Sequence, residues 1–241
     1  SEYTTGVTTT GTPGSAGAKT TIVVGSGVAT LYYYCSAHSG MGGQANTNST
    51  AGASNFDGSI QSTVKANPEA GFSIVSYVGN NTLGTSYGHG LNAAPSMIVV
   101  KNREASNENW AVYHKNLTSA NKYLSLNTSD GESGNTGWWN DTAPTASVFY
   151  TGNAGTTAGN NQDHIAYCFA PVAGYSAFGS FESTGNTDGP FVHLGFRPAL
   201  IFCKSIDSGS RNWMVFDSKR ATDNPIDAHL NWENSSAEGS Y

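Results

Sequence analysis

Hydrophobic residues along the chain occur in short runs that are rich in β-branched and aromatic side chains. Examples are TTIVV at 20–24, TLYYY at 30–34, FSIVSYV at 72–78 and WAVY at 110–113, separated by stretches rich in Gly, Asn, Asp and Pro. Short strands and the turns that join them have this pattern. No window of a dozen residues has the 3.6-residue hydrophobic period of an amphipathic helix. The pattern therefore predicts an all-β fold.

An internal repeat covers much of the chain, because residues 71–115 align with residues 174–218 without a gap at an offset of 103. We expect tandem β-sandwich-type units, with a first repeat at 71–173 and a second at 174–241. The first copy continues past residue 138, and the counterpart of that part would follow residue 241. We therefore expect the second repeat to be incomplete at its C-terminus. Nine positions are identical in the two copies: Gly71/Gly174, Ser73/Ser176, Leu91/Leu194, Pro95/Pro198, Ile98/Ile201, Lys101/Lys204, Asn109/Asn212, Trp110/Trp213 and Val112/Val215.

Two segments precede the repeats. We expect residues 1–50 to form a separate β unit, and the absence of an initiator Met suggests that this unit is incomplete at its N-terminus. Residues 51–70 carry few apolar side chains, so the sequence predicts a linker there.

Composition limits the partners of such a protein. Charged residues make up 12% of the chain and aromatic residues 11%, which favours a turn-rich β protein over a helical or disordered one. The formal net charge is −6 and Lys and Arg form no cluster, so the attraction that nucleic acids and anionic membranes require is missing. The longest apolar runs, of about five residues, are too short to span a membrane. We expect no nucleic acid and no membrane insertion.

The strongest candidates for metal ligands lie in the stretch YYYCSAHSGMGG at 32–43. The spacing Cys35-x2-His38-x2-Met41 places a thiolate, an imidazole and a thioether in one loop, and these are the donor types of a copper electron-transfer centre. Over roughly residues 18–50 the chain resembles the C-terminal ligand loop of cupredoxins, the blue-copper proteins. That resemblance implies a cupredoxin-like β segment with copper as a candidate cofactor.

A blue-copper site also needs a second His in the trigonal plane, and in cupredoxins that His precedes the Cys by a long way. All six histidines of this chain lie at or after the loop. Two interpretations remain: the upstream ligand belongs to sequence that precedes residue 1, or the loop survives as packing without copper. The second interpretation predicts no cofactor.

No catalytic constellation is present in the sequence, so we expect no enzymatic activity. The carboxylates are scattered in Gly- and Asn-rich turns, and neither a Gly-x-Ser-x-Gly elbow nor a His-Glu-x-x-His motif occurs. Aromatic side chains stack on sugars in many lectins. Trp110 and Trp213 recur at one repeat position and are predicted to be core anchors, whereas Trp138 and Trp139 are the candidates for an exposed glycan contact.

Several segments of the sequence together resemble a family of repetitive virion proteins of marine and cyanobacterial tailed phages. These segments include LYYYCSAHSGMGGQANT, SNFDGSIQSTVKAN, GHGLNAAPSMIVVKNR, HIAYCFAPVAGYSAFGSF and DGPFVHLGFRPALIFCK. The resemblance implies a tail-fibre or surface-appendage protein on the virion. Its partners would be other copies of itself in a homo-oligomer such as a trimer, other virion proteins and host-surface glycans. The alternatives are a secreted copper-binding electron-transfer protein and a carbohydrate-binding module.

Overall fold

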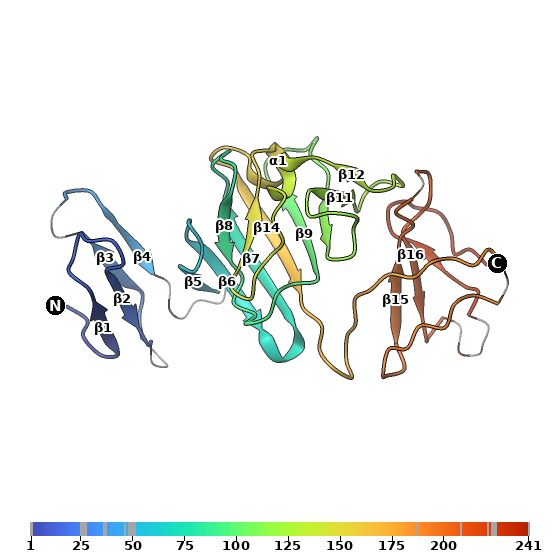
Figure 1. Ribbon diagram of the computed structural model, residues 1–241, viewed down its shortest axis with the longest axis horizontal. Helices are drawn as coiled ribbons and strands as arrows, with labels where there is room; N and C mark the ends of the chain where they lie inside the picture. Colours follow the sequence, from blue (N-terminus) through green and yellow to red (C-terminus); the bar gives the residue numbers. More distant parts are fainter. Residues whose placement is uncertain are drawn as a thin grey trace. The chain divides into compact units, whose positions relative to one another are not determined.

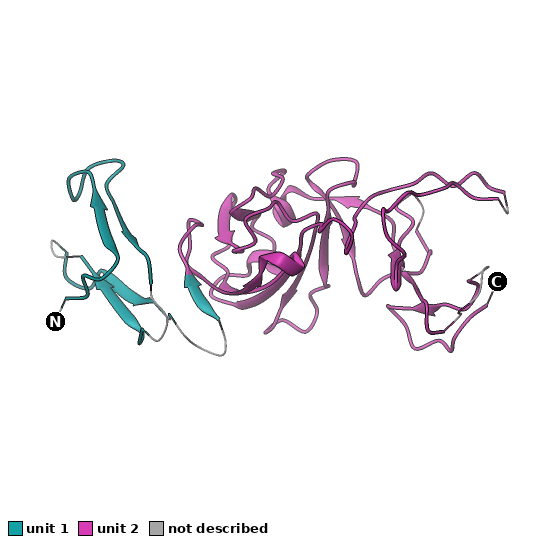
Figure 2. Ribbon diagram, turned by 90° about the horizontal axis from the view of Figure 1, so that it is seen from below, with its two compact units in different colours: residues 1–54 teal, residues 55–241 magenta. Residues whose placement is uncertain are grey.

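The computed structural model describes residues 2–24, 28–35, 38–45, 47, 52–186, 188–207, 209–220, 222 and 226–240 of the 241-residue chain. These residues form seventeen β-strands and only two single-turn α-helices, so the predicted all-β fold is confirmed. The chain divides into two compact units, residues 1–54 and residues 55–241, which are coloured separately in Figure 2.

The first unit contains two antiparallel hairpins. Strand β1 (Val7–Thr10) pairs with β2 (Lys19–Ile22), and β3 (Leu31–Tyr34) pairs with β4 (Gly42–Ala45). Each hairpin is a separate two-stranded sheet. Among the described residues of this unit, no pairing joins the two hairpins into one sheet.

An eight-stranded sheet has the order β12-β11-β10-β9-β14-β7-β6-β5, and all its strands lie in the second unit except β5, which spans residues 54 and 55 at the boundary. Figure 1 labels most of these strands. Strand β14 lies between β7 and β9 and pairs antiparallel with both, so a strand from late in the first repeat closes the sheet. The strands of this sheet are β5 (Ala53–Asn55), β6 (Ser62–Asn67), β7 (Phe72–Val78), β9 (Met97–Asn102), β10 (Ala111–His114), β11 (Lys122–Ser125), β12 (Ser133–Gly134) and β14 (Asp163–Phe169).

The prediction of a linker at 51–70 is wrong, because β5 and β6 belong to this sheet. Strand β6 pairs with β7 over five residues, and its inward side chains are Ser62 and Val64, both buried. A short 3-10 turn, η1 (Pro68–Ala70), then leads into β7. Strand β6 is held by backbone pairing and has only two small inward side chains. Its sequence therefore lacks the run of large apolar residues by which a strand is recognised.

A second layer covers one face of the eight-stranded sheet and makes the first repeat sandwich-like. It consists of the paired strands β8 (Thr85–Gly88) and β13 (Val148–Thr151) and the helices α1 (Thr136–Trp139) and α2 (Gly155–Ala158). The core between the layers, which we call the inner core, includes the buried side chains of Val75, Tyr77, Tyr87, Ile98, Val100, Tyr113, Trp138, Trp139, Phe149, Ala166 and Cys168.

The second repeat rebuilds part of the first with the same strand register. Strand β15 (Leu200–Cys203) pairs with β16 (Met214–Asp217) so that Leu200 faces Asp217, as Met97 faces His114 in the first repeat. Strand β17 (Leu230–Asn231) then pairs with β16 as β11 pairs with β10. The offset between the repeats is 103 over the first hairpin and becomes 106 at Leu124 and Leu230, because the second repeat has three extra residues.

This correspondence continues to the end of the described residues. Tyr123 pairs with Ser133 in the first repeat, and His229 forms the matching bridge with Gly239 in the second. The amide of Trp110 donates to Asn127 Oδ1 at 2.9 Å, and the amide of Trp213 donates to Glu233 Oε2 at 3.0 Å. The two repeats therefore share a meander, defined as β9 to β12 in the first repeat and as the three strands β15 to β17 with the His229–Gly239 bridge in the second.

The structure explains why two of these positions carry the same residue in both repeats. Gly71 and Gly174 both adopt a left-handed φ, at 63° and 75°, where a Cβ atom is unfavourable. Lys101 Nζ donates to the Glu108 carbonyl at 2.9 Å, and Lys204 Nζ donates to the equivalent Arg211 carbonyl at 2.7 Å. Each lysine thus closes the loop that follows the first strand of its meander.

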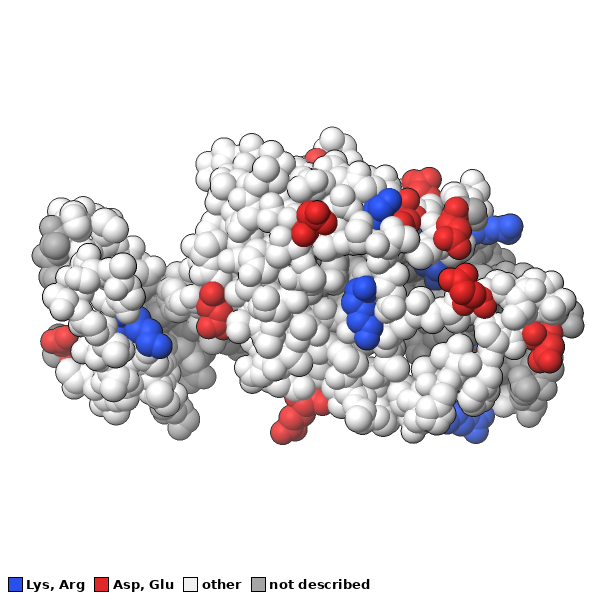
Figure 3. All heavy atoms as spheres, viewed as in Figure 1, with Lys and Arg blue, Asp and Glu red and all other residues white. Residues whose placement is uncertain are grey.

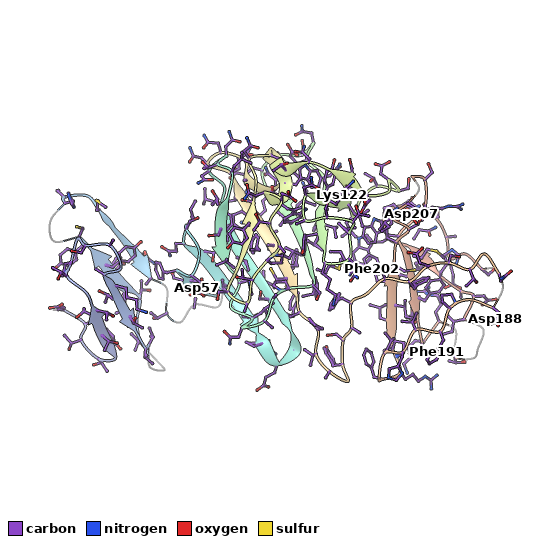
Figure 4. The ribbon with its side chains drawn as sticks, in the orientation of Figure 1. Asp57, Lys122, Asp188, Phe191, Phe202 and Asp207 are labelled. Carbon is purple, nitrogen blue, oxygen red and sulfur yellow. The ribbon has the colours of Figure 1, made fainter. Side chains whose placement is uncertain are left out.

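The two meanders pack against each other through equivalent faces. Trp213 is buried and donates from Nε1 to the Ser125 carbonyl at 3.0 Å, and Phe202 stacks on it with ring centroids 5.0 Å apart. Figure 4 labels Phe202 on β15. We call this contact the inter-repeat core; its buried members are Val99, Val112, Leu117, Leu124, Leu126 and Trp213. The prediction that Trp213 is a core anchor is confirmed, and Trp110 lies partly buried against the same cluster.

Two fully buried histidines, His89 and His164, belong to the first repeat. His164 Nδ1 lies 2.8 Å from the Gln162 carbonyl and its Nε2 lies 3.2 Å from the Gly155 carbonyl, while His89 Nε2 lies 3.1 Å from the Thr145 carbonyl. Burial lowers the pKa of both imidazoles below the ordinary value, and the hydrogen bonds to the carbonyls only partly oppose this shift. Both side chains therefore fasten turns as neutral imidazoles.

Replacing the inter-repeat anchor should destabilise the second unit. Trp213→Ala removes a buried indole and its hydrogen bond, so we expect the free energy of unfolding to fall by about 3–5 kcal/mol. Trp232→Ala is the matched control, because its indole is 60% exposed, and its loss should cost about 1 kcal/mol or less. Urea denaturation followed by circular dichroism measures both values. Equal losses in the two variants would contradict the inter-repeat core.

Stability should also fall in mild acid. The folded-state pKa of both buried histidines is lowered, so the unfolded chain binds more protons than the folded chain below about pH 6.5. The penalty is absent above that pH, grows as the pH falls below it and is complete once the folded pKa has been passed. Urea midpoints measured between about pH 7.5 and pH 5.5 check this, and His164→Gln should flatten the slope. A midpoint that does not change with pH would refute the assignment.

Candidate functional site

The Cys–His–Met loop joins the paired strands β3 and β4 in the first unit. The Cys35 amide donates to the Met41 carbonyl at 2.7 Å, which closes the base of the loop. Cys35 Sγ lies 3.3 Å from His38 Nδ1, so two of the three predicted ligand side chains lie together. The Met41 side chain is 59% exposed. These residues and the side chains of β3 line an open hollow of about 580 Å³.

The donor set of this loop fits a soft monovalent ion better than a blue-copper centre. A thiolate and an imidazole within one loop, with a thioether nearby, are ligands that Cu(I) accepts. A blue-copper trigonal plane needs a second imidazole, and no group of three or more His, Cys, Asp or Glu side chains converges anywhere in the described part of the chain. Cys35 Sγ and His38 Nδ1 are thus the two donor atoms of the loop that lie together and could hold a soft ion.

The expectation of exposed side chains at Trp138 and Trp139 is wrong. Both indoles belong to the inner core, where Trp139 is 1% exposed and Trp138 stacks on Tyr123 with centroids 3.6 Å apart. Helix α1 sets this geometry, because the Asn135 side chain caps its first turn and Asn140 ends it in the left-handed conformation. The two indoles present no open face to a sugar, so the structure removes the basis for a glycan contact there.

The other two cysteines are parts of the sheets. Cys168 is fully buried in β14, and burial raises the pKa of its thiol to about 12. Cys203 lies partly buried in β15, and burial raises its thiol pKa as well. A raised pKa leaves little thiolate at neutral pH.

An aromatic hollow of about 340 Å³ at the junction of the two repeats has no clear signal in the sequence. Phe72 and Phe169 pack beside each other in it with centroids 5.0 Å apart, and Tyr175 is 66% exposed. The Ser176 hydroxyl, its polar side chain, already accepts from the Val172 amide at 3.1 Å. The hollow thus offers apolar walls rather than a set of free hydrogen-bonding groups. It is lined by Ala70, Gly71, Phe72, Phe169, Ala170, Tyr175, Ser176 and Phe178.

Charged side chains are scattered over the face shown in Figure 3, where acidic and basic residues occur singly or in small mixed groups. Arg220 illustrates this arrangement, since it pairs with both Asp217 and Glu238. No continuous basic surface is visible on that face. Among the described residues, no helix is long and apolar enough to cross a membrane.

The geometry defines an all-β protein in which the meander of the first repeat recurs, with three strands, in the second. Residues 45–241 match the family described as a domain of unknown function, DUF7483. The chain belongs to this family, which takes in both repeats and β5 and β6. No curated protein and no solved structure matches the chain.

The metal chemistry of the loop can be checked directly. We expect the chain to take up about one Cu(I) ion in competition with a chromogenic chelator, because Cys35 and His38 lie together in an exposed loop. Cys35→Ser should abolish this uptake and His38→Gln should weaken it by about tenfold. Cys203→Ser is the matched control and should bind like the unaltered chain. Uptake that survives Cys35→Ser would place the ion elsewhere.

Proposed function

We propose that this protein is a structural component of a bacteriophage virion, in a tail fibre or another surface appendage. It would act outside the host cell, as one chain of a homo-oligomer that contacts other virion proteins, and without catalytic activity. The observation that carries the proposal is the inter-repeat core, in which two copies of one meander pack through equivalent faces.

Serial packing of β repeats suits an extended appendage. Each repeat buries apolar surface against the next repeat, so a chain can be lengthened by adding repeats without a new type of core. Here the buried Trp213 indole and the Lys204 ammonium both bond to carbonyls of the first repeat, at Ser125 and Ser129. Because hydrogen bonds are directional, these two bonds fix the orientation of one repeat on the other.

The surface and the sequence support the same role. Charged residues are sparse and the formal net charge is −6, which favours neither nucleic acid nor an anionic membrane as partner. The resemblance to repetitive virion proteins of tailed phages supplies the setting. Contact with host-surface glycans belongs to this proposal only through multivalency, because several weak contacts in an oligomer add up to firm attachment.

Two measurements test the proposal. Mass spectrometry of purified phage particles should detect this chain at a fixed ratio to the major capsid protein, and a specific antibody should label an appendage in electron micrographs. Native mass spectrometry of the isolated protein should show a homo-oligomer. Absence from the particles would refute the proposal. A strict monomer at high concentration would contradict the part of the proposal that makes this chain a subunit of an oligomeric fibre.

Copper carriage by the first unit is the second candidate function. The close approach of Cys35 Sγ to His38 Nδ1, at 3.3 Å, favours it. Binding at this loop would involve the first unit alone and is compatible with a structural role of the repeats.

A further inference from the structure

Two tyrosines of the first unit form an exposed aromatic face on the hairpin of β3 and β4, which Figure 1 labels. Successive side chains of a strand point to opposite faces, so Tyr32 and Tyr34 share one face of β3. Their side chains are 75% and 82% exposed. The two residues lie roughly 7 Å apart along the strand. One small ligand can therefore contact both rings.

Glycines of β4 keep the space beside these rings open. Gly42 pairs with Tyr34, and a Cβ atom placed on this glycine would lie 3.2 Å from Tyr34 Cβ. Gly43 pairs with Tyr33, whose ring lies so close that a Cβ atom on the glycine would be 2.6 Å from the Tyr33 hydroxyl oxygen. Tyr33 thus packs on its own hairpin, whereas the two exposed tyrosines project from the opposite face.

Neutral polar side chains lie beside the exposed rings. Gln44 pairs with Tyr32 across the hairpin, and His38 and Ser39 belong to the loop that joins the two strands. All of them line the open hollow of about 580 Å³. Aromatic walls with a small number of hydrogen-bonding groups are typical of sites for small ligands.

The absence of charge selects among ligands that stack on aromatic rings. The chain carries no Lys, Arg, Asp or Glu between residues 20 and 56, which include every lining residue of the hollow that the structure describes. Single-stranded nucleic acids stack their bases on aromatic rings but also need a basic groove for the phosphates. Anionic sugars are bound most strongly by cationic side chains. A neutral sugar needs neither, because its C–H face packs on an aromatic ring and its hydroxyl groups bond to neutral polar groups.

We propose that the hairpin of β3 and β4 is a binding site for a neutral oligosaccharide, which stacks on Tyr32 and Tyr34. The hydroxyl groups of the sugar bond to the amide of Gln44 and to the polar groups of the loop. This inference rests on the proposed function and deepens it, since it gives the contact with host-surface glycans a place on the chain. Binding at one open site is weak, and several chains in one oligomer make it firm.

The test uses the full chain and three fluorescently labelled neutral hexasaccharides, built from glucose, galactose and mannose. We expect saturable binding of at least one of them by fluorescence anisotropy, at protein concentrations up to the millimolar range. A labelled hexasaccharide of galacturonic acid, which is anionic, is the control and should bind at least about tenfold more weakly. A copper chelator should leave the affinity unchanged, because the tyrosine rings and not a metal hold the sugar.

Substitutions on this face locate the contact. Tyr32→Ala and Tyr34→Ala should each weaken binding by about tenfold, because each removes one stacking surface. Tyr34→Trp keeps an aromatic surface, so its affinity should stay within about threefold of that of the unaltered chain or exceed it. Tyr175→Ala is the matched control, because this side chain is 66% exposed in the second unit, and it should bind like the unaltered chain.

Three results would overturn the proposal. The first is the absence of saturable binding for all three neutral hexasaccharides. The second is binding of the galacturonic acid hexasaccharide that is equal or tighter. The third is full affinity in both Tyr32→Ala and Tyr34→Ala, which would place the sugar elsewhere. None of these results bears on the virion assignment, which depends on the presence of the chain in purified particles, so the two failures can be told apart.

Discussion

Packing of the two meanders through equivalent faces is the contact on which the second repeat depends. The second repeat has a three-stranded sheet and no inner core of its own among the described residues, and a sheet this small needs another surface to bury its apolar face. Trp213 and Phe202 supply that burial by resting on Val112, Leu124 and the rest of the inter-repeat core. The first repeat is thus both a folded unit and the template that orders the second.

The same dependence explains why one sequence pattern has two outcomes. Ile98 and Ile201 occupy the same position of the repeat, yet the first is buried and the second is 43% exposed. The difference lies in the partners and not in the local sequence, because α1 and β14 pack on the meander of the first repeat and no described element packs in the same way on that of the second. A strand needs an edge to pair with and a layer to cover it, and among the described residues 175–181 form only the single Val172–Ser176 bridge.

Much of this architecture could be predicted from the sequence, and the failures have physical causes. The ungapped offset located both copies of the hairpin, and the recurrence of Trp213 at the position of Trp110 marked it as a core residue. The three-residue insertion hid the rest of the correspondence. Strand β6 was missed because Ser62 and Val64 are small inward residues whose strand is held by backbone pairing. Trp138 and Trp139 were misplaced because burial of a single helical turn depends on tertiary packing.

The candidate sites divide in the same way. Cys35 and His38 are three residues apart, so their proximity follows from the loop and could be expected from the sequence. The exposure of Ile201 could not, since it depends on which elements pack against β15. The DUF7483 family match begins at residue 45, so it includes both repeats and leaves out the Cys–His–Met loop.

A double-mutant cycle between Trp213→Ala and Leu124→Ala tests the inter-repeat core most directly, because the two residues come from different repeats. If the repeats pack as described, the two substitutions are coupled, and the free energies of unfolding should depart from additivity by about 1 kcal/mol or more. Additivity within about 0.3 kcal/mol would contradict the account, since it would mean that the two side chains do not share a core.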